Sequence, residues 1–189
     1  MDKNIEKYVK IYKNFLHKDF CNKLVKNIKN LSWQEHYFTE FDSPKQIKLS
    51  GKNELSTSYE RQISTEHKFI IDKLYTKIKQ YIDELNFSWF SGWRAYSLLR
   101  FNRYTKNKTM AEHCDHITSL FDNKGGVPIL SVVILLNDNF KGGEFIMFKN
   151  KEYKLKTGDL LIFPSNFLFP HKVKPVKKGI RYSAVSWVW

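Results

Sequence analysis

The feature that most constrains this fold is a change of hydrophobic period at Trp93. From there to the end, the chain consists of short strand-like runs separated by turn residues such as Gly142-Gly143 and Gly158-Asp159. We expect about eight strands, over 95–101, 110–115, 129–136, 144–148, 152–156, 159–163, 171–175 and 180–188. Many short strands following a helical region are typical of a double-sheet jelly roll with helices on one side.

The first 92 residues have a different pattern. Residues 5–16 are compatible with a short strand, and apolar side chains at helical spacing predict helices over roughly 18–31 and from Thr65 to about Asn86. Between them, residues 32–64 are expected to form short strands and a long loop, with the loop 43–62 as the segment that contacts substrate. The expected fold class is α+β: a double-stranded β-helix (93–189) supported by N-terminal helices packed on one sheet (1–92), in a single domain over 1–189.

The composition constrains the domain size, the partners and the compartment of the protein more than the reaction that it carries out. At 189 residues with 42% hydrophobic side chains, the chain can bury one sizeable core. The net charge of +13 favours acidic partners, nucleic acid or a ribosome surface included, although a solvated lysine-rich surface explains it equally simply. No apolar window is long enough to span a membrane, and Cys21 and Cys114 are an unconvincing disulfide pair. We therefore expect a cytoplasmic protein, of a bacterium or of a phage-infected host.

Four residues of the strand region suggest chemistry. In an extended run, His113 and Asp115 point to the same face, and a distant strand can add His171. Two imidazoles and one carboxylate on one side of a metal form the facial arrangement of non-haem Fe(II) oxygenases. Arg181, ten residues beyond His171, can line the same cavity, where its planar fork suits a carboxylate.

This ordered set, together with the runs Phe140–Glu144, Gly158–Pro164 and His171–Trp187, resembles the Fe(II)/2-oxoglutarate-dependent dioxygenases, within them the prolyl 4-hydroxylase group. The resemblance covers residues 93–189. It implies three iron ligands, which are also the catalytic residues: His113, Asp115 and His171. It further implies that Arg181, assisted by Ser183 and Tyr104, binds 2-oxoglutarate. The implied cofactors are Fe(II), 2-oxoglutarate and O2, with ascorbate as an optional addition.

The sequence departs from the family pattern at one position and leaves several residues open. Met110 stands where the family often has a second tyrosine. Trp187 faces either the core or the pocket, whereas His116 and the turn 122–126 are expected at the surface. Tyr59 and Arg61 fall in the region where relatives hold peptides, although a solvated role is the simpler interpretation for both.

The resemblance implies hydroxylation of a prolyl residue in a protein substrate, which the basic surface suggests to be a ribosomal protein. 2-Oxoglutarate and O2 would be converted to succinate and CO2. One alternative is hydroxylation of a free amino acid or another small molecule. The other, from a different class, is a cupin-like binding module without catalysis, for example a structural protein associated with nucleic acid. The iron ligands come from the residue set, whereas the proline assignment comes only from the resemblance.

Overall fold

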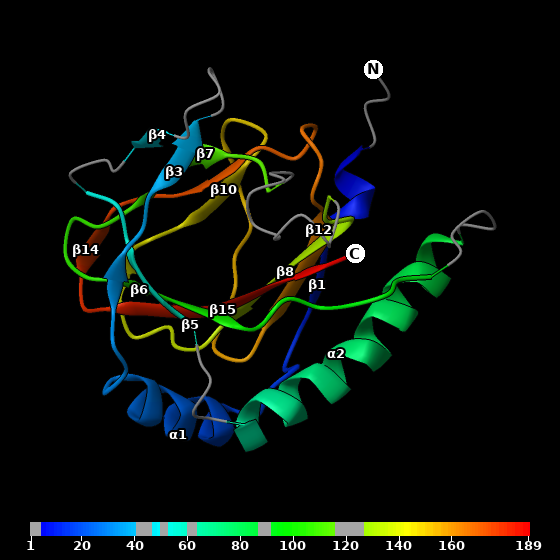
Figure 1. Ribbon diagram of the computed structural model, residues 1–189, viewed down its shortest axis with the longest axis horizontal. Coiled ribbons are helices and arrows are strands. Elements are labelled where there is room, and N and C mark those ends of the chain that lie inside the picture. The colour runs from blue at the N-terminus through cyan, green and yellow to red at the C-terminus, as the bar shows by residue number, and fades with distance from the viewer. Residues whose placement is uncertain (1–4, 41–46, 50–52, 60–63, 87–91, 116–126) are drawn as a thin grey trace.

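The computed structural model describes residues 5–40, 47–49, 53–59, 64–86, 92–115 and 127–189. Two antiparallel sheets face each other (Figure 1). The larger sheet contains, in spatial order, β1 (Lys10–Tyr12), β12 (Leu160–Pro164), β8 (Leu130–Leu135), β15 (Arg181–Val188), β6 (Arg100–Tyr104), β5 (Ser56–Tyr59) and β2 (Gln34–Glu35). The smaller sheet contains β11 (Lys151–Glu152), β10 (Phe145–Met147), β13 (His171–Val173) and β7 (Met110–His113).

Two short ribbons complete the β structure. β14 (Val176–Lys178) pairs with β9 (Lys141–Gly142), and β3 (Phe38–Glu40) pairs with β4 (Ile47–Leu49). A single 3₁₀ turn, η1 (Ile5–Tyr8), precedes β1. The architecture is the predicted double-stranded β-helix of an α+β protein.

Both helices lie on the outer face of the larger sheet (Figure 1). α1 (Lys18–Ile28) and α2 (Ser64–Leu85) are amphipathic, and their apolar sides pack on the strands. The helices and the strands share one cluster of buried side chains, which includes Leu24, Ile28, Ile70, Leu74, Ile78, Phe101, Ile134, Tyr182 and Ala184. We call this cluster the outer core. It confirms the expectation that the helices pack on one sheet.

A second cluster fills the space between the two sheets. Its members include Tyr104, Val133, Phe145, Phe163, Val173, Val185 and Trp187. We call it the inner core. Because successive side chains of a strand point to opposite faces, β6 and β15 contribute alternate residues to the outer and the inner core.

The predicted strand over 95–101 is wrong in its bounds, since β6 runs from Arg100 to Tyr104. The preceding residues instead follow the end of β15. The backbone N–H groups of Arg94 and Ala95 both donate to the carbonyl of Trp189, and Tyr96 forms an isolated bridge with Val188. The apolar pattern over 95–101 therefore belongs to two segments, one that runs beside the end of β15 and one that begins β6. The helical expectations were closer, within three residues at each end.

The Gly158-Asp159 turn before β12 has a structural role. Gly158 has φ +85°, and a Cβ there would lie 2.0 Å from the carbonyl oxygen of Leu16. The buried Asp159 carboxylate accepts from the backbone N–H of Asn14 at 3.1 Å and from Lys13 Nζ at 2.8 Å. These contacts therefore bind the N-terminal segment to the jelly roll.

The two cysteines are free, as expected. Cys21 is buried in the outer core, and Cys114 is half-buried. Neither of the helices in the described part of the chain is long and apolar enough to cross a membrane.

Candidate metal centre

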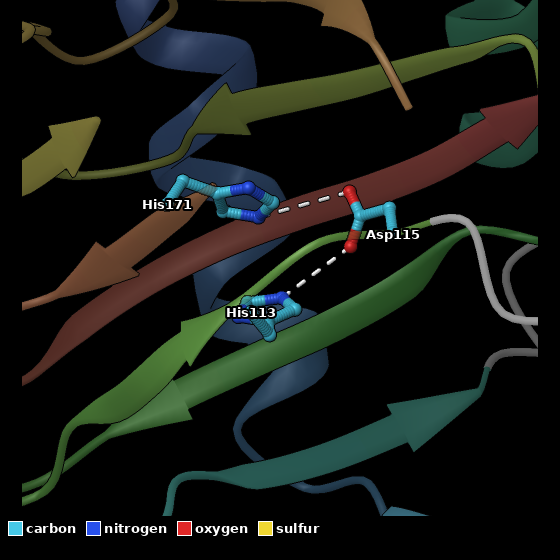
Figure 2. Close-up of side chains that lie close together, drawn as sticks. All are labelled: His113, Asp115 and His171. Atoms are coloured by element: carbon cyan, nitrogen blue, oxygen red, sulfur yellow. Dashed lines mark ion pairs between the residues drawn. The ribbon is translucent and has the colours of Figure 1, made fainter. Parts of the chain in front are cut away.

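Three potential metal ligands meet where β7 ends and β13 begins. The pairing of β7 with β13 sets His113 directly opposite His171, and Asp115 follows two residues after His113. Nε2 of His113 lies 3.3 Å from Oδ1 of Asp115, and Nε2 of His171 lies 3.7 Å from Oδ2 (Figure 2). One ligand atom from each residue falls within 4.8 Å of the others.

Both imidazole rings are oriented by the backbone. Nδ1 of His113 lies 2.8 Å from the carbonyl oxygen of Ala111, and Nδ1 of His171 lies 3.1 Å from that of Phe169. A carbonyl oxygen only accepts, so each Nδ1 carries the proton and donates it. The lone pair of each ring is thereby left on Nε2, which faces Asp115 (Figure 2).

Asp115 is held by a hydroxyl from the larger sheet. Ser131 Oγ donates to Asp115 Oδ2 at 2.6 Å, and a second hydroxyl, from Ser165, lies 2.8 Å from that of Ser131. Burial alone would raise the pKa of Asp115, but the neighbouring imidazoles of His171 and His113, together with the hydrogen bond donated by Ser131, outweigh it and hold the pKa well below its usual range. The group is therefore an ionised carboxylate at neutral pH.

His171 is neutral at the same pH. Burial, reinforced by the neighbouring His113, lowers the pKa of His171 to about 4. Its ring stacks on Phe145, with centroids 5.4 Å apart, and meets the edge of Phe163 at 5.0 Å. A neutral imidazole fixed by aromatic packing is the form that binds a metal.

Arg181 lies deeper between the sheets and is only 2% exposed. Its Nη1 donates to Ser183 Oγ at 3.0 Å, and its guanidinium lies 4.9 Å from the centre of the Tyr104 ring. Arg181 Nε is buried and finds no hydrogen-bond partner among the described residues. A buried cation with an orphan donor is costly unless an anion binds to it, so this site fits a carboxylate.

One narrow cavity joins these groups. Its lining includes the three potential ligands, Arg181, Ser183, Tyr104, Met110 and Arg100. Tyr104 hydroxyl contacts Met110 Sδ at 3.7 Å, so the methionine occupies space beside the tyrosine. Burial raises the pKa of Tyr104 and outweighs the opposing effect of the Arg181 charge. The Tyr104 hydroxyl is therefore protonated and able to donate a hydrogen bond. The structure thus brings all six predicted site residues to one cavity.

The remaining candidates are placed elsewhere or fall outside the described residues. Trp187 is buried in the inner core beside the cavity, whereas Tyr59 is 55% exposed at the end of β5. Cys114 Sγ, half-buried, contacts the carbonyl of Phe167 at 3.5 Å. Arg61, His116 and the turn 122–126 lie outside the described residues.

Sequence reasoning missed three polar residues of this region. Ser131 is the single hydroxyl in the apolar run 130–136, a pattern that a buried acceptor would explain. Arg100 and Asn102 precede Tyr104 by four and two residues, so strand alternation puts all three on the cavity face. The misplaced start of β6 is the reason they were overlooked.

The donor set fits ferrous iron. Two neutral imidazoles and an ionised carboxylate on one side, with the opposite side facing a cavity, match the geometry of mononuclear Fe(II) sites. Residues 99–189 match the sequence model of the 2OG-Fe(II) oxygenase superfamily.

Among curated proteins, the chain is 34% identical over 101 residues to the PKHD-type hydroxylase YbiX of Escherichia coli O1:K1 / APEC. The match covers 50% of this chain and 44% of that relative, so this chain spans less than half the length of the curated relatives it matches.

Solved structures resemble the whole chain. The viral collagen prolyl hydroxylase vCPH from Paramecium Bursaria Chlorella virus-1 aligns with a TM-score of 0.67 and 17% identity, covering 96% of this chain and 94% of that chain. A prolyl hydroxylase from Trichoplax adhaerens, in complex with a hypoxia inducible factor peptide fragment, gives 0.70 and 16%, over 97% and 84%. A Pseudomonas putida prolyl-4-hydroxylase gives 0.64 and 19%, over 96% and 91%. These likenesses show the fold.

Proposed function

We propose that this protein is an Fe(II)- and 2-oxoglutarate-dependent dioxygenase that hydroxylates a prolyl residue of a protein or peptide, because residues 99–189 match the sequence model of the 2OG-Fe(II) oxygenase superfamily. The observation that carries the proposal is one cavity lined by both the His113–Asp115–His171 set and a buried arginine. The proposed catalytic unit is the single domain 1–189.

Each side chain has a role that follows from its surroundings. His113, Asp115 and His171 would hold Fe(II), with Nε2 of each ring already directed at the carboxylate. Arg181 would bind the distal carboxylate of 2-oxoglutarate through its rigid fork, and Ser183 positions that fork through Nη1. Tyr104 would donate a hydrogen bond from its protonated hydroxyl to the same co-substrate.

When bound, Fe(II), 2-oxoglutarate and O2 would together supply the oxidising chemistry, with succinate and CO2 as the co-products. The chain contributes orientation and exclusion of water. The aromatic rings of Phe145 and Phe163 keep His171 in place, and Ser131 keeps Asp115 from turning toward the core. Such outer partners fix the geometry and basicity of the ligands they contact.

The prolyl substrate rests on likeness alone. One of the structural neighbours is a prolyl hydroxylase in complex with a peptide, which supports a protein or peptide substrate. A ribosomal substrate has only the net charge of +13 in its favour, and a cytoplasmic location likewise stays a prediction.

The test is formation of succinate from labelled 2-oxoglutarate in the presence of Fe(II), ascorbate and O2. We expect His113→Ala to reduce turnover at least about 100-fold. Changing a residue that only hydrogen-bonds to a metal ligand already lowers metal affinity or activity about 10–100-fold. His17→Ala, whose side chain is 80% exposed, is the matched control and should retain parental turnover. Equal turnover of His113→Ala and the parent would remove His113 from the proposed iron site.

A negative result has its own meaning. If the parent forms no succinate and takes up no Fe(II) in equilibrium dialysis, a binding module without catalysis becomes the better proposal. If it takes up Fe(II) without forming succinate, the metal site stands and the co-substrate assignment is wrong.

A further inference from the structure

We propose that Arg100 binds a carboxylate of the primary substrate, so that this protein acts on a substrate whose reacting carbon lies close to an acidic group. The inference rests on the proposed function and adds the substrate class to it. The observations are the burial of Arg100, the absence of a described acidic partner, and its position in the cavity of the metal centre.

Arg100 is a buried cation with an incomplete set of partners. It is 5% exposed, and its Nε donates to Asn102 Oδ1 at 3.1 Å. Its guanidinium carbon lies 4.7 Å from the centre of the Trp187 ring. Among the described residues, no carboxylate lies within 4.0 Å of it, and Asn102 is the only hydrogen-bond acceptor that it reaches. Burying such a charge is costly unless an anion compensates it.

The contacts of Arg100 leave the two terminal nitrogens of its guanidinium, Nη1 and Nη2, available to a ligand. The indole of Trp187 covers one face of the guanidinium, and Asn102 occupies Nε. The two terminal nitrogens therefore have no partner in the described part of the chain. These two nitrogens form the edge that binds both oxygens of a carboxylate at once.

Arg100 is separate from the proposed 2-oxoglutarate site. Strand β6 presents Arg100, Asn102 and Tyr104 to the cavity, and their partners on β15 are Val185, Ser183 and Arg181. At about 3.3 Å per residue, the backbone positions of Arg100 and Tyr104 are roughly 13 Å apart. Arg181 rests on the ring of Tyr104, whereas Arg100 rests on that of Trp187. The two arginines thus occupy opposite ends of the same row.

The charges lining the cavity leave Arg100 uncompensated. The described residues that line the cavity include two arginines but one carboxylate, Asp115, which faces the two imidazoles. Arg181 is assigned to the co-substrate. The other buried carboxylate of this region, Glu54, does not line the cavity: it accepts from the N–H of Ala111 at 3.0 Å and lies 3.3 Å from His36 Nδ1. A substrate carboxylate would fill the remaining need.

The proximity of Arg100 to the reacting centre makes it a specificity residue. Arg100 lines the same narrow cavity as His113, Asp115 and His171. A carboxylate bound there would hold a nearby carbon over the metal centre.

The experiment compares charged and uncharged probes by calorimetric titration of the full chain loaded with Fe(II) and 2-oxoglutarate in the absence of O2. The probes are N-acetyl-L-proline against N-acetyl-L-prolinamide, free L-proline, and two short peptides in which proline follows either aspartate or asparagine. We expect at least one carboxylate probe to bind the parent about tenfold or more tightly than its uncharged counterpart. Which probe does so identifies the source of the carboxylate.

Variants then assign the preference to Arg100. Arg100→Gln should abolish the preference for the carboxylate, and Arg100→Lys should keep part of it, because lysine retains the charge without the fork. Arg103→Gln is the matched control, since Arg103 lies on the same strand but packs over Trp33, 4.5 Å from the ring centre. The parent comparison needs no variant, so it stands even if Arg100→Gln does not fold.

Three outcomes would overturn the proposal. They are equal affinity of the parent for charged and uncharged probes, no binding of any carboxylate probe, and a preference that survives in Arg100→Gln. If Arg100→Gln instead weakens 2-oxoglutarate, Arg100 belongs to the co-substrate site and the proposal is likewise wrong. The proposed function fails separately, through the absence of succinate, whatever the probes show.

Discussion

The two faces of β6 and β15 differ sharply although they belong to the same strands. The outer face carries apolar side chains such as Phe101, Tyr182 and Ala184, which pack under the helices. The inner face carries Arg100, Arg181 and other polar groups beside the metal centre. Because the side-chain period of a strand is two, one strand can serve the core with one residue and the site with the next.

This difference separates what stabilises the fold from what the site needs. Outer-core residues gain free energy by leaving water, about 25 cal/mol for each Å² of apolar surface buried. Inner-face arginines and the buried Asp115 lose hydration, and only partly recover it through Ser183, Asn102 and Ser131. The outer core should therefore carry more of the stability, and the inner face should be a place of tolerated strain.

The largest expected effect tests the outer face. Leu74→Ala on α2 should lower the free energy of unfolding by about 2–5 kcal/mol, because a fully buried leucine is replaced by a cavity. Urea unfolding measures this loss. Turnover per folded molecule should stay at the parental level, since Leu74 belongs to the outer core and is not one of the residues that line the cavity.

The proposed division between the two faces is contradicted if Leu74→Ala leaves stability unchanged or lowers turnover. A Leu74→Ala protein of parental stability would show that the helices contribute little to the core. One that is stable but inactive would show that the outer layer positions the metal centre directly. Phe69→Ala, on the exposed side of the same helix and 44% exposed, is the control and should change stability far less.

A smaller effect, that of pH, tests the inner face in the metal-free protein. The pKa of His171 falls from 6.5 to about 4 in the folded state, so below pH 6.5 the unfolded chain binds a proton that the folded chain does not. The free energy of unfolding should then fall between pH 6.5 and pH 4, by up to about 3 kcal/mol. Burial also lowers the pKa of His36, which acts in the same direction.

Urea unfolding in the presence of a chelator, repeated across this range, measures the slope. His171→Gln should remove most of it, whereas His17→Gln should leave it unchanged, because the His17 side chain is 80% exposed. A slope that is the same in the parent and in His171→Gln would contradict the assignment of a buried, neutral imidazole to this position.

The same two faces explain how much the sequence could predict. The helices and the ordered set from His113 to Arg181 were visible because hydrophobic period and ligand chemistry are local properties. Arg100 and Ser131 were missed, since a buried polar residue in a strand is recognised only by what lies opposite to it. The bounds of β6 failed for a related reason: residues 94–97 are paired with the end of the chain, which no local pattern encodes.

The smallest expected effect concerns Arg181 and sharpens the comparison within the inner face. Arg181→Lys keeps a positive charge but loses the planar fork and the bond from Nη1 to Ser183. We expect the dissociation constant of 2-oxoglutarate to rise about tenfold, which corresponds to about 1.4 kcal/mol, with little change in turnover at saturating co-substrate. Titration of the Fe(II)-loaded protein in the absence of O2 measures the affinity, and the succinate assay measures the turnover. Arg103→Lys, on the outer face of β6, should leave both unchanged. If both arginines gave the same result, the two faces would not differ in function as their chemistry indicates, and the buried guanidinium beside Tyr104 would be a structural cation instead of a co-substrate ligand.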